Sequence, residues 1–71
     1  MSERELRVSI NGEARRYPAP MTVTELLADL GVDERQVGVE RNQSLVPKSE
    51  FSTVQLSDGD ELEIVTFVGG G

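Results

Sequence analysis

The sequence contains no cysteine and no histidine, and these two absences exclude several classes of chemistry. Without cysteine the chain forms no disulfide and offers no thiol nucleophile, and without histidine it has no imidazole base. A zinc site built from cysteine and histidine is excluded for the same reason. Because small secreted domains usually depend on disulfides for their stability, the sequence favours a cytoplasmic protein.

Basic residues and long apolar stretches are also scarce. Seven Lys and Arg residues stand against 13 Asp and Glu residues, which gives a formal net charge of −6. Phosphate backbones and anionic lipids repel such a chain, so a nucleic-acid-binding function is disfavoured. The apolar runs are far shorter than the ~20 residues of a membrane-spanning helix. No apolar run follows Met1 to Arg4, so no secretion signal is expected.

The length of 71 residues suits one small domain. A domain of this size buries only ~60% of the surface that its unfolded chain exposes. The core is therefore modest, and a deep ligand cavity is not expected. Since no repeat, linker or low-complexity stretch divides the chain, we expect one folded domain over residues 1–68 and a flexible glycine tail at 69–71.

Alternation of apolar and polar residues predicts several strands. The alternation runs from Leu6 to Ile10, and Asn11-Gly12 follows as a strong hairpin signal, because both residues tolerate positive φ. The longest β-branched run comes after a turn at Gly59 and predicts a central last strand. A proline ends the short fourth strand, which suits an edge position. The expected strands cover residues 6–10, 13–17, 37–41, 44–46 and 61–68.

One helix is expected over residues 23–30. Thr22 and Glu25 have the spacing of a capping box, in which each side chain satisfies a free backbone N–H at the helix start. Gly31 follows the last apolar residue, where a left-handed residue ends many helices. Because a helix of about two turns is too short to persist unpacked, it must lie against the sheet.

The order of the elements favours an α+β fold of the β-grasp type. In this fold a mixed sheet, here of four to five strands, carries one helix across one face. A ferredoxin-like arrangement would need a second full helix, which the sequence does not offer. One further helical turn is expected at 49–51, with Phe51 closing one end of the core.

The chain ends in Val68-Gly69-Gly70-Gly71, and the terminal carboxylate is the most promising reactive group. Glycines lack Cβ atoms, so this tail can enter a narrow enzyme tunnel that bulkier residues would block. Gly71 is the expected covalent site, and Gly69 and Gly70 are expected to form the flexible segment that precedes it. Because a carboxylate is a poor electrophile and the chain has no nucleotide-binding motif, a separate ATP-using enzyme must activate it. Inert glycines remain the alternative interpretation.

The last strand predicts a docking surface beside this tail. Leu62 and Ile64 point to one side of the strand, which the helix is expected to cover. Val65 and Phe67 then lie on the open side, where exposed apolar side chains are typical of a docking patch. We expect Val65, Phe67 and Val68 to bind a partner. The alternative is that Phe67 folds over the sheet edge and contributes to packing.

The acidic excess favours a basic partner through electrostatic steering, although most surface carboxylates serve only solubility. Asp58 and Asp60 do not have the ligand spacing of a calcium loop, so no metal site is expected. Tyr17 and the Ser and Thr hydroxyls have no base to activate them and are assigned no chemistry.

Six segments spread along the chain carry a family resemblance. They are 11–12 (NG), 22–27 (TVTELL), 39–42 (VERN), 46–51 (VPKSEF), 58–60 (DGD) and 67–71 (FVGGG). With these segments the sequence resembles the ThiS family, the sulfur carriers of thiamine biosynthesis, over essentially the whole chain. A terminal Gly-Gly is common to ubiquitin-like carriers in general, whereas the short length and the segments 39–42 and 46–51 favour ThiS. The third glycine is a departure, since many relatives have two.

The resemblance implies a ubiquitin-like carrier and not an enzyme. It implies a ThiF-type adenylyltransferase that uses ATP and Mg²⁺ to form an acyl-adenylate on Gly71, so that the carrier itself binds no cofactor stably. Sulfur from a cysteine desulfurase persulfide would then displace AMP and leave a thiocarboxylate. The thiazole synthase ThiG is the implied acceptor of this sulfur.

Three alternatives stay open at this point. The same chemistry could supply molybdopterin synthase or a tRNA-thiolating system. A ubiquitin-like protein modifier would share the tail and the adenylation step but form an isopeptide bond. An interaction module with inert glycines would require no ATP-dependent modification.

Overall fold

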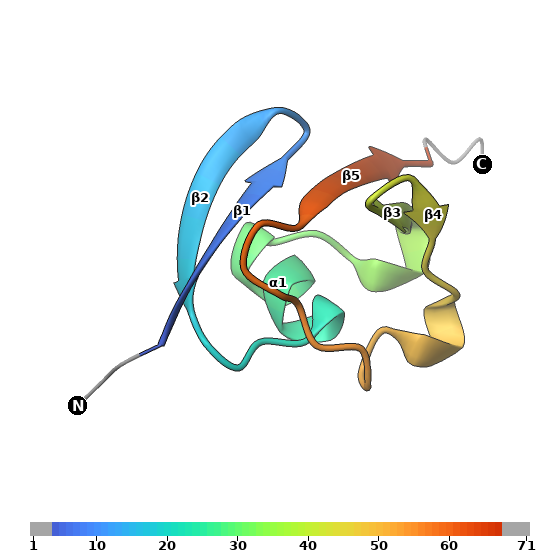
Figure 1. Cartoon of the computed structure of the whole chain (residues 1–71). Coiled ribbons are helices and arrows are strands. Elements are labelled where there is room, and N and C mark those ends of the chain that lie inside the picture. Colours follow the sequence, from blue (N-terminus) through green and yellow to red (C-terminus); the bar gives the residue numbers. More distant parts are fainter. Residues whose placement is uncertain (1–3, 68–71) are drawn as a thin grey trace.

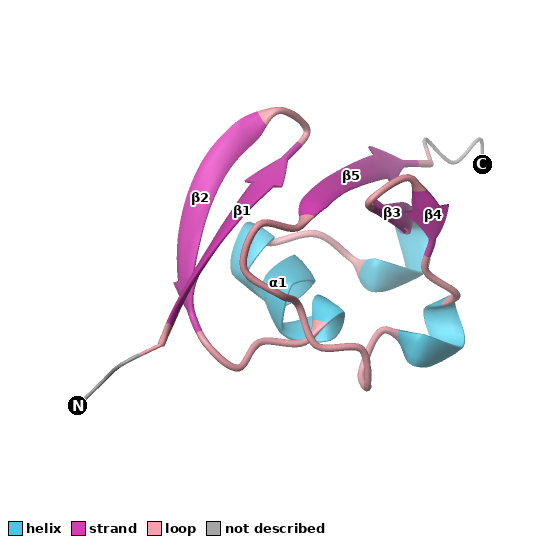
Figure 2. Ribbon diagram, in the orientation of Figure 1, coloured by secondary structure: helices cyan, strands magenta, loops and turns pink. Residues whose placement is uncertain are grey.

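The computed structural model describes residues 4–67, which form one mixed sheet and one α-helix (Figure 1). The helix is α1 (Val23–Leu30), and two short 3₁₀ helices are η1 (Glu34–Gln36) and η2 (Lys48–Glu50). The α+β class expected from the sequence is confirmed (Figure 2). The strands are β1 (Glu5–Ile10), β2 (Glu13–Pro18), β3 (Val37–Arg41), β4 (Ser44–Leu45) and β5 (Glu61–Thr66).

The five strands lie in the order β2-β1-β5-β3-β4. Strands β1 and β5 run parallel, and the other neighbouring strands are antiparallel. The last strand of the chain is therefore central, as predicted, and β2 and β4 are the edges. Helix α1 lies on the concave side of the curved sheet, which leaves the opposite face open (Figure 1). This is the β-grasp arrangement expected from the order of the elements.

Helix α1 begins and ends where its local signals predict. The backbone N–H of Glu25 donates to the Thr22 hydroxyl at 3.2 Å, and the Thr22 N–H donates to the Glu25 carboxylate at 2.9 Å. This capping box satisfies two N–H groups that the helix itself cannot pair. At the other end Gly31 has a φ of 75°, and its N–H donates to the Ala28 carbonyl.

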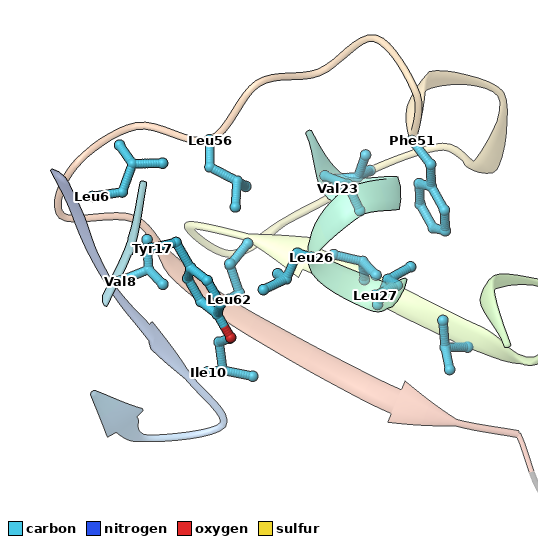
Figure 3. Packing of buried hydrophobic residues seen from close by; sticks show 13 residues of the cluster. Leu6, Val8, Ile10, Tyr17, Val23, Leu26, Leu27, Phe51, Leu56 and Leu62 are labelled. Atoms are coloured by element: carbon cyan, nitrogen blue, oxygen red, sulfur yellow. The ribbon is translucent and has the colours of Figure 1, made fainter. Parts of the chain in front are cut away.

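The hydrophobic core fills the space between α1 and the sheet (Figure 3). Helix α1 contributes three buried side chains, and Phe51 closes one end of the core with 2% of its surface exposed. The role predicted for Phe51 is therefore confirmed. The buried apolar residues are Leu6, Val8, Ile10, Tyr17, Val23, Leu26, Leu27, Val37, Val39, Val46, Phe51, Leu56 and Leu62.

Strand β5 is shorter than the predicted range of 61–68. It ends at Thr66, because the partner of Thr66 is Val37, the first residue of β3. The chain stays attached for one more residue, since the Phe67 N–H donates to the Gln36 carbonyl at 2.8 Å. Val68 lies outside the described residues.

Smaller differences occur at β4 and the two 3₁₀ helices. Strand β4 was expected to reach Val46, but that side chain turns into the core while its N–H donates to the Val39 carbonyl. The helical turn η2 begins one residue earlier than expected. The sequence did not predict η1, whose first turn is capped by the Asp33 side chain.

The predicted division into residues 1–68 and 69–71 falls outside the described residues. Within residues 4–67, the helices are all too short or too polar to cross a membrane.

Candidate functional site

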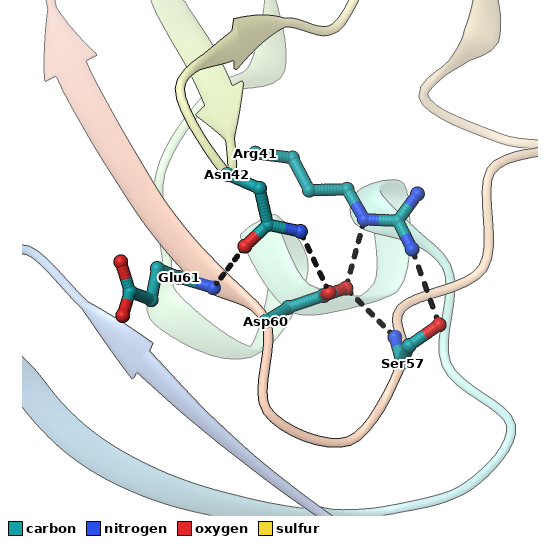
Figure 4. A network of polar contacts seen from close by, with 5 residues as sticks. All are labelled: Arg41, Asn42, Ser57, Asp60 and Glu61. Atoms are coloured by element: carbon teal, nitrogen blue, oxygen red, sulfur yellow. Dashed lines mark hydrogen bonds and ion pairs between the residues drawn. The ribbon is translucent and has the colours of Figure 1, made fainter.

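A buried carboxylate fixes the chain where β5 begins (Figure 4). Asp60 is 5% exposed and accepts a hydrogen bond from the Ser57 N–H at 2.7 Å. It also accepts from the Asn42 amide at 3.0 Å and from Nε of Arg41 at 2.8 Å. These contacts tie the turn before β5 to the end of β3 and to the β3–β4 turn. Asp60 is therefore part of the support for the central strand.

The protonation state of Asp60 follows from this environment. Burial would raise the pKa of its carboxyl, but the hydrogen bonds from Ser57, Asn42 and Arg41 outweigh burial and hold the pKa below the ordinary value of 3.8. Asp60 is thus a carboxylate at neutral pH, and its donors are positioned to keep it so.

Two turn asparagines hold β5 from both sides. On the β1 side, Oδ1 of Asn11 accepts from the Ile64 N–H at 2.8 Å, and Nδ2 donates to the Ile64 carbonyl at 3.2 Å. On the β3 side, Oδ1 of Asn42 accepts from the Glu61 N–H at 3.0 Å, and the Asn42 N–H donates to the Glu61 carbonyl at 2.7 Å. Both asparagines have positive φ, 53° and 52°, a conformation that asparagine tolerates well. Their side chains extend the pairing of β5 beyond the strand ladders.

The far end of β5 carries the predicted docking residues. Val65 is 56% exposed and Phe67 is 54% exposed. A Cβ atom at Gly38 would lie 3.2 Å from Cζ of Phe67, so the ring lies directly over this glycine. Lys48 stands above the ring, with Nζ 5.7 Å from its centre, and donates to the Arg35 carbonyl at 2.8 Å. Phe67 is therefore both packed on the sheet and accessible.

The structure brings two of the predicted site residues together on one face. Gly38 is the β3 partner of Val65, and the buried neighbours Val37 and Val39 point to the helix side. Val65 and the Phe67 ring consequently lie on the open face of the sheet. Their role in docking stays a prediction. The other predicted residues, Val68, Gly69, Gly70 and Gly71, lie outside the described residues.

Sequence reasoning missed one exposed apolar residue on this face. Leu45 on the edge strand β4 is 70% exposed and is the cross-strand partner of Glu40. The alternation of strand residues could have indicated it, because side chains of successive strand residues point to opposite sides. With Val46 in the core, Leu45 points to the open face. The short length of β4 hid this alternation.

The fold and this site define a class, namely a small β-grasp domain whose central strand leads directly toward the C-terminal end. The sequence model of the ThiS family matches residues 8–71. The chain belongs to the ThiS family.

Individual relatives agree with this assignment. The chain is 56% identical to a thiazole synthase of Paramagnetospirillum magneticum over 66 residues, which are 93% of the chain but 20% of that protein. It is 44% identical to the sulfur carrier protein ThiS of Bacillus subtilis over 50 residues, covering 70% of the chain and 76% of that protein. The crystal structure of the thiamine biosynthesis protein ThiS from Geobacter metallireducens is 32% identical, with a TM-score of 0.78, covering 93% of this chain and 100% of that chain.

The coverage differs among these relatives. The chain spans about a fifth of the length of the first two thiazole synthases that it matches. It spans most of the length of the ThiS relatives and all of the Geobacter structure. The similarity to the synthases is therefore a similarity to one part of each.

Proposed function

We propose that this chain is a sulfur carrier of thiamine biosynthesis and that Gly71 is its covalent site. The observation that carries the proposal is the match to the ThiS family, which runs through residue 71 and therefore includes the terminal glycines. The whole-chain similarity to a ThiS crystal structure supports it.

The proposed reaction takes place on the terminal carboxylate in three steps. A ThiF-type enzyme binds ATP and Mg²⁺, and a carboxylate oxygen of Gly71 attacks the α-phosphorus of ATP with release of pyrophosphate. The terminal sulfur of a cysteine desulfurase persulfide then attacks the acyl carbon, and AMP leaves. A thiol reduces the resulting acyl disulfide to a thiocarboxylate, which donates its sulfur to a ThiG-type thiazole synthase.

The chain contributes attachment and recognition to this chemistry. It has no cysteine, so a carried sulfur meets no thiol of the same chain. Gly69 and Gly70 give the enzymes access to Gly71, since a backbone without Cβ atoms fits a narrow passage. The proposed docking surface for the partner enzymes lies just before this tail and consists of Val65, Phe67 and Val68.

The proposed acceptor is supported by one relative in particular. The thiazole synthase of Paramagnetospirillum magneticum contains a stretch that is 56% identical to this chain. A carrier-like segment and a thiazole synthase thus occur within one named protein. This favours thiazole synthesis over molybdopterin synthesis, tRNA thiolation and protein modification.

The test is an intact mass spectrum after incubation with ATP, Mg²⁺, cysteine, a cysteine desulfurase, a thiol and the ThiF-type enzyme. We expect the mass to rise by the difference between sulfur and oxygen, with the gain localised to Gly71 by fragmentation. A chain that lacks Gly71 is the control and should stay unchanged. An unmodified wild-type chain in the presence of an active enzyme would refute the proposal.

A second assay tests the acceptor. The thiocarboxylate form is incubated with a ThiG-type synthase or with a molybdopterin synthase, and loss of the carried sulfur is followed by mass. Transfer only to the thiazole synthase is the expected result. Transfer only to molybdopterin synthase would leave the carrier chemistry intact and overturn the pathway.

A further inference from the structure

The open face of the sheet carries three closely spaced glutamates. Glu40 on β3 and Glu63 on β5 are direct cross-strand partners, and both are exposed. Glu61 lies two residues before Glu63 and therefore points to the same side of β5. The three side chains line a shallow hollow of about 570 Å³, which also contacts Ser9 and Gln43. We call this feature the acidic hollow.

Within residues 4–67, five arginines form ion pairs with carboxylates other than these three, and the lysine is also engaged elsewhere. Lys48 donates to a backbone carbonyl and stands over Phe67. Like charges placed directly opposite each other destabilise a sheet, so the pair of Glu40 and Glu63 works against the stability of the free chain. The ion pairs of the described residues are Arg7–Asp58, Arg15–Glu13, Arg16–Glu5, Arg35–Asp33 and Arg41–Asp60.

Exposed apolar side chains border the acidic hollow. Leu45, 70% exposed, is the β4 partner of Glu40, and Val65, 56% exposed, follows Glu63 on the same side of β5. The Phe67 ring comes next, over Gly38. One continuous face therefore combines apolar groups with three carboxylates that have no ion-pair partner among residues 4–67, and the strand at its centre leads toward the C-terminal end.

We propose that the acidic hollow together with Leu45, Val65 and Phe67 forms one docking face for a protein that presents arginine or lysine side chains beside an apolar patch. A guanidinium in the hollow donates to more than one carboxylate and removes the repulsion between them. Around this charged contact, the side chains of Leu45, Val65 and Phe67 bury apolar surface against the partner. The proposal rests on the proposed function, because the partner meant is the adenylating enzyme that must hold the tail.

Charge and geometry argue against other occupants of this face. Within residues 4–67, no group of three or more acidic side chains is arranged to hold a metal ion. A second copy of the chain also carries a net charge of −6 and is repelled at long range, and nucleic acids and anionic lipids are negative as well. A basic protein surface is the occupant that complements this face.

The test compares two charge-matched double variants. Glu40→Gln/Glu63→Gln neutralises the hollow, and Asp29→Asn/Glu34→Gln removes the same charge from α1 and η1 on the other side of the chain. Binding to the ThiF-type enzyme without ATP is measured by calorimetry at low and high salt. The KM for the carrier and the kcat of adenylation are measured in parallel, and thermal unfolding reports the stability of each free variant.

The hollow variant should bind about tenfold more weakly at low salt and raise KM correspondingly, because it loses complementary charges at the interface. Its kcat should not change, and its dependence on salt should be weaker than that of the wild type. Its melting temperature should equal or exceed that of the wild type, since a like-charge pair is gone. The control variant should bind as the wild type does.

Three results of the comparison between variants would overturn the inference. They are an unchanged affinity of the hollow variant, an equal loss in the control variant, or a loss of affinity that follows a lower melting temperature. Failure of the proposed function is a separate observation, namely a wild-type chain that binds the enzyme but gains no sulfur at Gly71. A wild-type chain that does not bind the enzyme would overturn both.

Discussion

Removal of the Asp60 carboxylate should destabilise the chain more than any exposed charge change. Three donors converge on this group, from Ser57, Asn42 and Arg41, and the carboxylate is 5% exposed. In Asp60→Ala these donors lose their common acceptor at the point where β5 begins. The register of the central strand therefore depends directly on this side chain.

The magnitude follows from how buried the partners are. Loss of one member of a buried ion pair costs about 3–5 kcal/mol. The Arg41 side chain is 28% exposed and can turn toward water, so the lower end of about 3 kcal/mol is appropriate. A core of this size without disulfides supplies about 3–5 kcal/mol, so Asp60→Ala should lose most of the stability. Asp60→Asn keeps the shape but places an NH₂ group among donors, and about 2 kcal/mol should be lost.

The same network makes stability depend on pH. The pKa of Asp60 is lowered in the folded chain, so the unfolded chain binds a proton at higher pH than the folded chain does. The stabilisation is complete above the unfolded pKa of 3.8 and is lost as the pH falls through the lower folded pKa. Asp60→Asn, which has no carboxyl to titrate at this position, should show a flatter decline below about pH 4.

The assay is urea unfolding followed by far-UV circular dichroism, because the chain has no tryptophan. Asp29→Asn, an exposed change on α1, is the control and should match the stability of the wild type at neutral pH. A loss of less than about 1 kcal/mol in Asp60→Ala would mean that the network contributes no more than a surface ion pair. Equal acid sensitivity of Asp60→Asn and the wild type would refute the role assigned to its titration.

Three further changes test the second half of β5 and the residue that follows it. Asn11→Ala removes both side-chain hydrogen bonds to Ile64 and places alanine at a φ of 53°, so it should cost about 2–3 kcal/mol and speed amide exchange at Ile64, as followed by NMR. Gly38→Ala places a Cβ atom 3.2 Å from Cζ of Phe67, so the ring must shift by a few tenths of an ångström, and its NMR signals should move while the stability changes by less than about 1 kcal/mol. Phe67→Asp should fold normally but abolish adenylation by the ThiF-type enzyme, with Phe67→Leu largely active, and normal modification of Phe67→Asp would contradict a docking role.

The fold was predictable because the residues that form its first turn and end its helix act locally. Asn11-Gly12, the Thr22 and Glu25 pair and Gly31 each act through neighbours within four residues, so their effect can be read without knowledge of the tertiary structure. The strand bounds were less predictable where pairing decides them. Strand β5 ends at Thr66 because β3 begins at its partner Val37, a fact of register and not of local sequence.

The site was predictable only where alternation along one strand was sufficient. Val65 and Phe67 could be assigned to the open face in this way. Asp60 could not be distinguished from the exposed Asp58, because its partner Arg41 lies 19 residues away. The pair of Glu40 and Glu63 likewise depends on the register between β3 and β5. Contacts across strands decide these features, and a single sequence does not contain them.

The central position of β5 has a mechanical consequence. Tension applied at Phe67 along the axis of β5 loads the hydrogen bonds on both sides of this strand. Because the hydrogen bonds to β1 and β3 run across that axis, the load shears them together and does not peel them away one at a time. The amides of Asn11 and Asn42 share this load from opposite sides. The two strands beside β5 therefore resist tension that is applied at the end of this central strand.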